Sequence, residues 1–333
     1  MKNTTLMNFS MPISIGITKG ELWVQLVFFY LTIGGWASIV GNGLILTAII
    51  RHRNDLHSRF FVVVAALSLT KGLLAFQNVI MTLYRIFRTF GYVSINQSRL
   101  NCLLLHFFMP PLFTVEVLIL IVMVIDRGLA ILASTFYRNL TSKQMAVACA
   151  GTMVIGSLLK LGMAFGMGDV PLLMVIACVN VASPVSSTYQ LINANLDLVL
   201  VLILLTSYIS LILFFRLCST TVSNETAVAS VKRQKKVLIT LRNVVFIHCA
   251  FTLTAKIILT IGSSVPGDGG IRLMAYGGII TQCDEFTNLI ALMVSRPKLK
   301  EACLGGLMKL ASAMVPSFFT QTKVHPSGGV WKI

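Results

Sequence analysis

The sequence predicts an all-α membrane protein, a bundle of seven transmembrane helices. Hydrophobic residues make up 56% of the 333-residue chain, charged residues only 11%, and the mean hydropathy is +0.85. A soluble domain carries charge on about a quarter of its residues. A helix that crosses the hydrocarbon layer of a membrane needs about 20 mostly apolar residues. The chain supplies such a run seven times, at 24–50, 60–84, 102–133, 144–167, 194–217, 236–264 and 271–295.

The segments around these spans are short. Residues 1–23 are mixed in character and lack the pattern of a cleaved signal, so the first span is expected to target the chain to the membrane. The stretch 171–184 is apolar but too short to span, and we expect a loop packed on the bundle. Pro110 and Pro111 predict a kink near the outer end of the third span, facing a cavity or serving packing alone. Residues 296–333 are expected to form a short cytoplasmic helix and a polar tail.

Lysine and arginine side chains predict the orientation of the bundle. The first, third and fifth connections contain twelve of these residues, against four in the second, fourth and sixth. Because basic residues are enriched in cytoplasmic loops, we expect the amino terminus outside and the carboxyl-terminal tail, with six more, inside. The net charge of +16 then reflects a basic face next to anionic lipid, and nucleic-acid binding is not expected.

Asparagines in the pattern Asn-X-Ser/Thr are candidates for glycosylation. Asn3, Asn8 and Asn96 fall outside in this orientation, where a glycan could be attached. The same pattern at Asn139 and Asn224 falls inside, and we interpret those two as chance matches.

The seven cysteines are an odd number and cannot all form pairs. Only Cys102, at the outer start of the third span, and Cys178, in the outer loop after the fourth, lie at matching depth in an oxidising compartment. We expect a disulfide between them that fixes the loop over the mouth of the bundle; two unpaired apolar side chains are the alternative. Cys303, after the seventh span, is a candidate for acylation at the inner leaflet.

Ionisable residues stand deep inside the predicted spans at four positions: Lys71, Glu116, Asp284 and Glu285. Because a charge in hydrocarbon costs several kcal/mol, such residues pair with one another or serve a function. We therefore expect the base and the acids to meet in the core of the bundle. Lys160 and Lys256 lie closer to the outer ends of their spans, where a lysine can extend to the interface.

The sequence contains no pattern for covalent chemistry. Its five histidines are scattered, and no metal-ligand spacing, nucleophile motif or phosphate loop is present. We therefore expect neither an enzyme nor a cofactor. A small transporter or channel that uses the buried charges as an ion path is a competing function, although the sequence has no inverted repeat to favour it.

The chain resembles the rhodopsin-like G-protein-coupled receptors over nearly its whole length. Gly41 and Asn42 match the Gly-Asn of that family's first span, and Cys102 precedes Arg127 by the family's spacing of 25 residues. The segment DRGLAILASTFY, at 126–137, follows the family pattern D-R-Y-x-A-I-x-x-P-x-x-Y in five of its residues.

Departures from the family's motifs point to a divergent branch. FIHCAFT, at 246–252, has Ala250 and Thr252 in place of the family's Trp and Pro, and NLIAL keeps only Asn288 of N-P-x-x-Y. Together with FYRNLTSKQ, at 136–144, these features are similar to the nematode serpentine chemoreceptors of the Srsx type. This resemblance implies a sensory receptor for environmental small molecules, at the plasma membrane or in a sensory cilium, with a heterotrimeric G protein as its partner.

The resemblance also implies three sites. The G-protein switch would consist of Asp126, Arg127, Tyr137 and Tyr208. A buried charge cluster would replace the family's sodium site, with an ammonium in place of the ion: Asn42, Lys71, Glu116, Asp284 and Asn288. The ligand pocket would be lined by Met109, Phe113, Leu253, Lys256, Tyr276 and Gln282. Met109 replaces the acid of amine receptors and Gln282 the retinal lysine of opsins, which argues against a cationic amine and a Schiff base.

Overall fold

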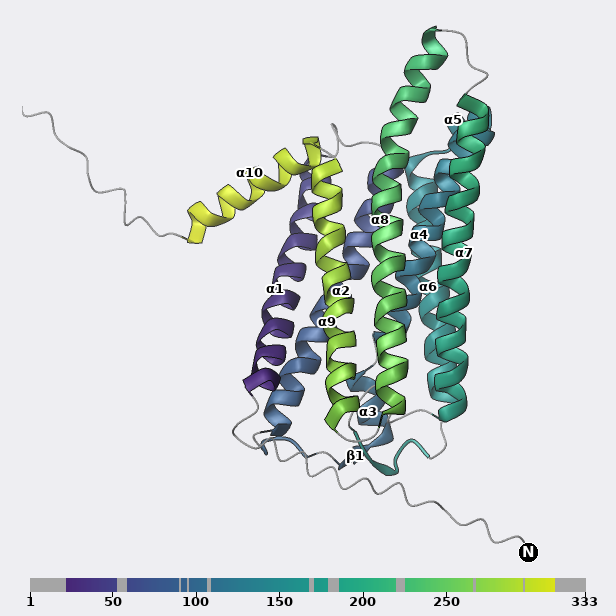
Figure 1. The fold of residues 1–333 in the computed structure, drawn as a ribbon. Coiled ribbons are helices and arrows are strands. Elements are labelled where there is room, and N and C mark those ends of the chain that lie inside the picture. The colour runs from purple at the N-terminus through teal and green to yellow at the C-terminus, as the bar shows by residue number, and fades with distance from the viewer. Residues whose placement is uncertain are drawn as a thin grey trace, which may run out of the picture.

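The computed structural model describes residues 22–52, 59–89, 91–94, 96–106, 109–167, 171–178, 186–219, 225–265, 268–295 and 297–314. Within these ranges seven long helices stand side by side in a bundle (Figure 1): α1 (Leu22–Arg51), α2 (Arg59–Thr89), α4 (Met109–Leu132), α6 (Ser142–Gly166), α7 (Ser187–Ser219), α8 (Glu225–Ser264) and α9 (Asp268–Ser295). The remaining elements are smaller: α3 (Arg99–Leu105), α5 (Ser134–Asn139), α10 (Pro297–Met314), β1 (Asn96–Ser98) and β2 (Val175–Ala177). The prediction of an all-α seven-helix bundle is confirmed, with one very small sheet added.

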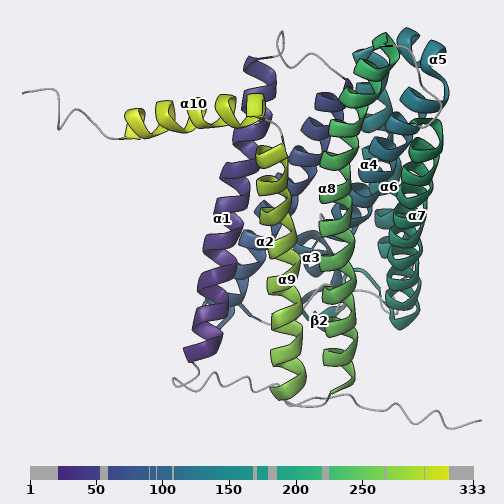
Figure 2. The same cartoon turned by 45° about the horizontal axis from the view of Figure 1, so that its top comes forward.

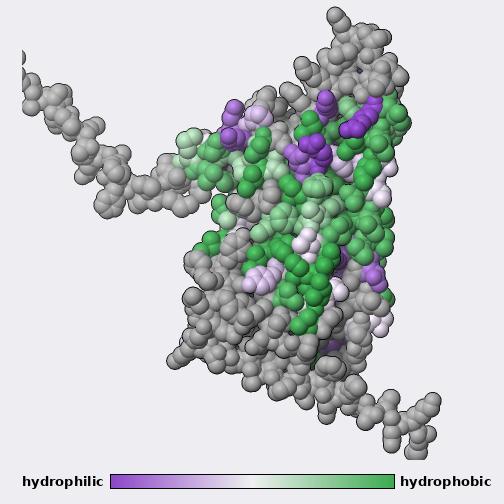
Figure 3. All heavy atoms as spheres, viewed as in Figure 1, coloured by the Kyte–Doolittle hydropathy of each residue, from purple (hydrophilic) through white to green (hydrophobic). Residues whose placement is uncertain are grey.

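The outward faces of the bundle are apolar, as a lipid-facing surface requires. On α6, Val147, Ile155 and Leu158 are each at least 65% exposed. Hydrophobic residues, in green, cover much of the visible flank in Figure 3, and hydrophilic residues, in purple, gather mainly toward the end that carries α10. Five helices, α1, α2, α6, α7 and α8, contain stretches long and apolar enough to cross a membrane within the described residues.

The two ends of the bundle differ. The elements α3 and β1 lie at one end (Figure 1), and β2 pairs with β1 there; α5 and α10 lie at the opposite end, as Figure 2 also shows. We name these the outer and the inner end, following the lysine and arginine bias. In both views α10 leaves α9 at a steep angle, so the expected short helix after the seventh span is confirmed.

The outer loop between α6 and α7 is attached to the bundle at several points. Strand β2 pairs antiparallel with β1, with Gln97 opposite Ile176. The expected disulfide between Cys102 and Cys178 is present, with a Cα–Cα distance of 5.6 Å. The buried guanidinium of Arg99 donates to two carbonyls in the last turn of α6, at 3.1 and 3.4 Å. These contacts fix the loop to β1 and α3, and α3 to the outer end of α6.

The third span differs from the sequence prediction of one kinked helix over 102–133. Helix α3 ends at Leu105 and α4 begins at Met109, so Pro110 and Pro111 lie in the first turn of a new helix. Proline is tolerated there because the first backbone N–H groups of a helix have no intrahelical acceptor. The prolines therefore start a helix and do not bend one.

The core combines large apolar side chains with close helix packing. Leu67, Leu120 and Leu241 from α2, α4 and α8 are fully or almost fully buried in one cluster. A Cβ atom on Gly277 of α9 would lie 2.7 Å from the Cγ atom of Leu259 in α8, which is too close. Glycine at this position permits the two helices to approach closely, as small residues do in membrane bundles.

Candidate functional site

At the inner end, α4 carries an ion pair between consecutive residues. The Nε atom of Arg127 donates to Oδ2 of Asp126 at 2.8 Å, and the carboxylate is almost fully buried. A terminal nitrogen of Arg127 also donates to the hydroxyl of Tyr137 in α5. Two hydrogen-bond partners therefore engage the guanidinium at the inner end of the bundle, and its carbon also lies 5.8 Å from the centroid of the Phe60 ring in α2.

Tyr137 is itself fixed from the side of α2. The guanidinium carbon of Arg59 lies 3.5 Å from the centroid of the Tyr137 ring, and Arg59 also donates to the backbone carbonyl of Tyr137. Burial raises the pKa of Tyr137, so its hydroxyl stays protonated and available to hydrogen-bond Arg127 and Asp126. The start of α2, the inner part of α4 and helix α5 thus form one connected group.

Tyr208, the fourth expected switch residue, lies on α7 and is buried. Its hydroxyl donates to the backbone carbonyl of Leu238 in α8 at 3.1 Å. Its described contacts do not include Arg127. In this conformation Tyr208 connects α7 to α8, and its described hydrogen bond does not reach the ion pair.

In the middle of the bundle, the structure brings together the lysine and two of the acids expected there. The Nζ atom of Lys71 in α2 lies 2.6 Å from Oε1 of Glu116 in α4 and 3.2 Å from Oδ2 of Asp284 in α9. All three residues are at most 4% exposed. Attraction between opposite charges is strong at such sites because little water screens it.

His248 of α8 completes this cluster, and sequence reasoning missed it. Its Nδ1 atom lies 3.0 Å from Oε1 of Glu116 and 2.9 Å from Oδ2 of Asp284, the same two oxygens that face Lys71. Two nitrogens and two carboxylate oxygens therefore alternate around a ring. When His248 is protonated, two positive and two negative charges face each other and the ring has no net charge. We name Lys71, Glu116, His248 and Asp284 the buried charge ring.

The buried charge ring has a donor set that could hold a metal ion. Ligand atoms of Glu116, His248 and Asp284 lie within 4.8 Å of one another. The ammonium of Lys71, however, is within 3.2 Å of both carboxylates. The positive charge of Lys71 already offsets the charge of the carboxylates, as a bound metal ion would, and it would repel a metal ion.

The other members expected in this cluster are placed differently. The amide of Asn42 donates to the carbonyl and the hydroxyl of Ser38 within α1, at 2.9 and 3.2 Å. It lies against α2, where a Cβ on Gly72 would be 3.7 Å away, but its described hydrogen bonds do not reach the ring. The side chains of Glu285 and Asn288 lie outside the described part of the structure.

A second ionic cluster lies nearer the outer end, around Asp197 of α7. Its Oδ1 atom is 2.9 Å from Nζ of Lys160 in α6 and accepts from the hydroxyl of Thr114 in α4 at 3.0 Å. Its Oδ2 atom is 3.1 Å from Nζ of Lys256 in α8. Lys160 also donates to the side-chain oxygen of Asn193. We name Thr114, Lys160, Asn193, Asp197 and Lys256 the outer lysine cluster.

This cluster corrects the expectation that Lys160 extends to an interface. Lys160 is 0% exposed and turns inward to Asp197. The importance of Asp197 was missed, although the residue lies inside the predicted span 194–217 and the rule that a charge in a span needs a partner applies to it.

The remaining residues expected in the ligand pocket are only partly described. Phe113 of α4 and Leu253 of α8 are half-buried, and Tyr276 of α9 is 52% exposed. The side chains of Met109 and Gln282 lie outside the described part of the structure. Of the expected pocket residues, only Lys256 makes an ionic contact among the described residues.

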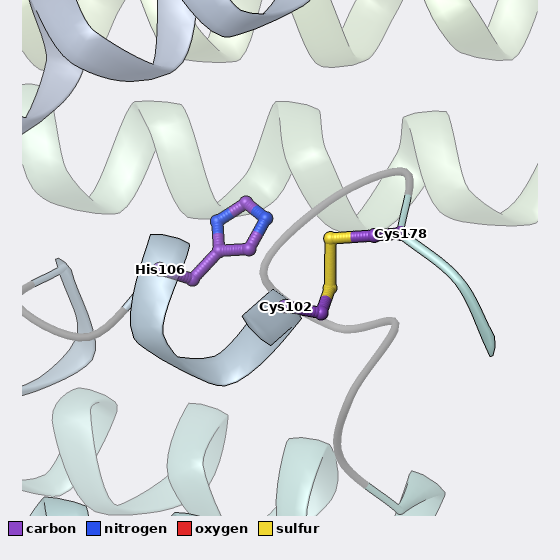
Figure 4. A group of neighbouring side chains, drawn as sticks. All are labelled: Cys102, His106 and Cys178. Atoms are coloured by element: carbon purple, nitrogen blue, oxygen red, sulfur yellow. A yellow bond between two sulfur atoms is a disulfide. The ribbon is translucent and has the colours of Figure 1, made fainter. Parts of the chain in front are cut away.

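His106 lies beside the outer disulfide, one turn after Cys102 (Figure 4). Its imidazole and the two sulfur atoms are close enough for metal ligation by distance alone. The sulfurs of Cys102 and Cys178, however, are bonded to each other and are not thiolates, which metal binding by cysteine requires. The group is therefore part of the loop anchor and not a metal site.

Two further predictions concern modification. Asn96 is exposed on β1 at the outer end, and Asn3 and Asn8 lie outside the described residues. Cys303 of α10 is 2% exposed, and burial raises the pKa of its thiol. Both properties disfavour acylation of Cys303 in this conformation.

The structure combines a seven-helix bundle, an outer loop anchored by a disulfide, and an acid–arginine pair at the inner end of the third span. These features are those of an integral membrane receptor. The family model described as 7 transmembrane receptor (rhodopsin family) matches residues 41–293, and the chain belongs to this family. Comparison with curated proteins gives no match. Members of this family are receptors and not enzymes, and in general terms they bind a ligand and act on a G protein.

Proposed function

We propose that this chain is a chemosensory receptor of the nematode Srsx type. It binds an extracellular small molecule in the outer half of the bundle and activates a heterotrimeric G protein at the inner end. The observation that carries the proposal is the contact group of Asp126, Arg127 and Tyr137, in which the arginine is engaged on the side where a G protein would bind.

Activation in this proposal is an equilibrium between two arrangements. In the resting arrangement Asp126 and Tyr137 hold Arg127, and the hydroxyl of Tyr208 connects α7 to α8. In the active arrangement the inner ends of α7 and α8 move away and Arg127 faces the G protein. A ligand shifts this equilibrium only by its differential affinity for the two arrangements.

The buried charge ring has a role in the same proposal. The ammonium of Lys71 takes the place that a sodium ion occupies in the middle of related receptors. It is covalently attached and does not exchange with the solvent, so the resting arrangement does not depend on sodium concentration. The support is the position of Lys71 between two buried carboxylates.

Transport or conduction is the competing function. It would use the buried charges as steps of an ion path. In the described residues, however, the ring's charged groups face one another, and its two cations neutralise its carboxylates when His248 is protonated. This arrangement favours a structural and switching role over an ion path.

The test measures both functions on the same preparation. The full chain, purified in lipid nanodiscs, is mixed with representative G-protein heterotrimers, and basal and ligand-stimulated nucleotide exchange is recorded. Exchange that Arg127→Ala abolishes supports the proposal. Absence of exchange with every heterotrimer, together with ion flux in reconstituted liposomes, would show a transporter or channel instead.

The topology of the proposal places residues 1–23 outside, 24–295 in the membrane and 296–333 in the cytoplasm of a plasma-membrane or ciliary receptor. Asn3, Asn8 and Asn96 would then carry glycans. Removal of N-linked glycans should increase gel mobility, and Asn96→Gln should reproduce part of that change. Glycans at Asn139 would reverse the assigned orientation.

A further inference from the structure

We infer that the outer lysine cluster binds the anionic group of a small organic acid with an apolar body. This inference rests on the proposed ligand-activated function and narrows it to a chemical class. It is carried by the charge imbalance of the cluster, by the accessible ammonium of Lys256 and by the hydroxyl of Tyr189, which lies farther out on α7 and has no hydrogen-bond partner among the described residues.

The cluster contains two ammonium groups and one carboxylate. Among the described residues, the salt bridges of Lys160 and of Lys256 both end on Asp197. The side chain of Lys160 is 0% exposed and that of Asp197 is 13% exposed, so little water compensates the excess positive charge. An uncompensated charge in such surroundings is costly, and a monoanion would neutralise it.

Lys256 provides the accessible position for that anion. Its side chain is 29% exposed, and the described contacts engage one of the three N–H donors of its ammonium. A ligand carboxylate can therefore bind Lys256 while Asp197 stays with Lys160 and Thr114. Bonds between an ammonium and a carboxylate are among the stronger hydrogen bonds in proteins.

A polar stripe on α7 extends from this position toward the outer end. Tyr189, Asn193 and Asp197 are spaced four residues apart and therefore share one face of the helix. Tyr189 is 2% exposed, and its hydroxyl has no hydrogen-bond partner among the described residues. A buried hydroxyl without a partner costs free energy, which a polar group of a ligand would recover. Tyr189 lies roughly 12 Å from Asp197 along the helix axis, at 1.5 Å per residue.

Two residues expected in the ligand pocket are close to the cluster in the sequence and favour an organic anion over an inorganic one. Phe113 precedes Thr114 on α4, and Leu253 lies one turn before Lys256 on α8; both side chains are half-buried. Apolar walls with a few placed polar groups are typical of sites for small organic ligands. A carboxylate at Lys256 with an apolar body against these side chains satisfies both features.

Binding at this position would also act on the bundle. The ion pair of Asp197 and Lys256 joins α7 to α8. A ligand carboxylate competes with Asp197 for the ammonium of Lys256 and weakens this connection. By loosening α8 at this point, the ligand would favour the proposed active arrangement, in which the inner ends of α7 and α8 move away and Arg127 faces the G protein, and so act as an agonist.

The experiment uses 4-phenylbutyrate and its primary amide as probes of the full chain in nanodiscs. The two probes have the same apolar body and differ in charge. We expect the acid to raise the melting temperature of the receptor in a saturable way and the amide to have little effect. Lys256→Met should weaken acid binding by about tenfold or more, and Lys256→Arg should retain it. Lys143→Met, which removes an exposed lysine at the inner end of α6, is the matched control and should bind as the wild type does.

A second variant keeps the inference testable if Lys256→Met folds poorly. Asp197→Asn removes the competing carboxylate and should bind the acid more tightly than the wild type. Equal stabilisation by acid and amide, no stabilisation by either, or unchanged binding in Lys256→Met would overturn the inference. None of these readouts involves a G protein, so nucleotide exchange remains an independent test of the proposed function.

Discussion

The Nζ atom of Lys71 lies 2.6 Å from Oε1 of Glu116, and both side chains are almost completely buried. This ion pair joins α2 to α4, and Asp284 and His248 extend it to α9 and α8. Four helices are therefore joined by one set of charges. Removing a single member leaves a charge that the interior cannot solvate.

Lys71→Met should destabilise the folded receptor by about 3 to 5 kcal/mol, the range for breaking a buried ion pair. The measurement is thermal unfolding of the purified receptor in nanodiscs. The double variant Lys71→Met with Glu116→Gln removes one charge of each sign and should recover part of the loss. Lys143→Met is the control and should unfold as the wild type does. If the double variant is less stable than Lys71→Met, an unbalanced charge is not the cause of the destabilisation in Lys71→Met.

Sodium should have no specific effect on the wild-type receptor. Because Lys71 already lies between the two carboxylates, a sodium ion would have to enter beside a fixed positive charge. Unfolding temperature and basal nucleotide exchange should be the same in sodium chloride and in choline chloride of equal ionic strength. A saturable difference between the two salts would argue against the proposed role of Lys71.

Tyr137→Phe should increase basal nucleotide exchange. The substitution removes the hydroxyl that engages Arg127 and keeps the aromatic ring beneath Arg59. Loss of one hydrogen bond is worth about 1 kcal/mol, which corresponds to roughly a fivefold change in the resting equilibrium. Tyr84→Phe, which removes a hydroxyl that accepts from Gln97 at the outer end, is the control and should leave basal exchange unchanged. Reduced exchange in Tyr137→Phe would mean that this hydroxyl serves the active arrangement.

Replacing Cys102 and Cys178 by serine should lower the unfolding free energy by about 4 kcal/mol, because the disulfide closes a long loop of the unfolded chain. The sequence separation of the two cysteines is 76 residues. The measurement is thermal unfolding with and without a reductant. The reductant should destabilise the wild type and have no further effect on the double variant. A reductant effect that persists in the double variant would place the sensitivity elsewhere.

Cys303 should react slowly with a maleimide and should not be acylated while α10 is packed. Its thiol is buried, and burial raises its pKa, which lowers the fraction of reactive thiolate. Leu304→Cys, introduced at the neighbouring position that is 44% exposed, is the matched control and should react at least about tenfold faster. Fast labelling of Cys303 in the folded receptor would show that α10 detaches readily.

Much of the fold could be predicted from the sequence because membranes impose strong constraints. Apolar runs of spanning length identified the seven long helices, and the lysine and arginine bias placed Cys102 and Cys178 at one end. The rule that charges in spans need partners anticipated the meeting of Lys71, Glu116 and Asp284. Each of these inferences depends on a local property of the chain.

The contacts that sequence reasoning missed depend on neighbours from distant helices. A histidine in a span can be neutral, so His248 did not by itself demand the two carboxylates that surround it. Asp197 lay close to the predicted start of its span at 194, whereas α7 begins at Ser187 and places Asp197 ten residues inside the helix. Strands of three residues, such as β1, are too short for a periodic signal.

Among the described residues, polar connections cross the boundary between α7 and α8 at Asp197 with Lys256 and at Tyr208 with the carbonyl of Leu238. On its other side α8 packs against α9 so closely that Gly277 has no room for a Cβ atom. Apolar packing weakens gradually as surfaces slide, whereas a hydrogen bond is lost within a fraction of an ångström. Any loss of these polar connections in the proposed active arrangement is therefore an all-or-none change, whereas the apolar contacts around them weaken gradually.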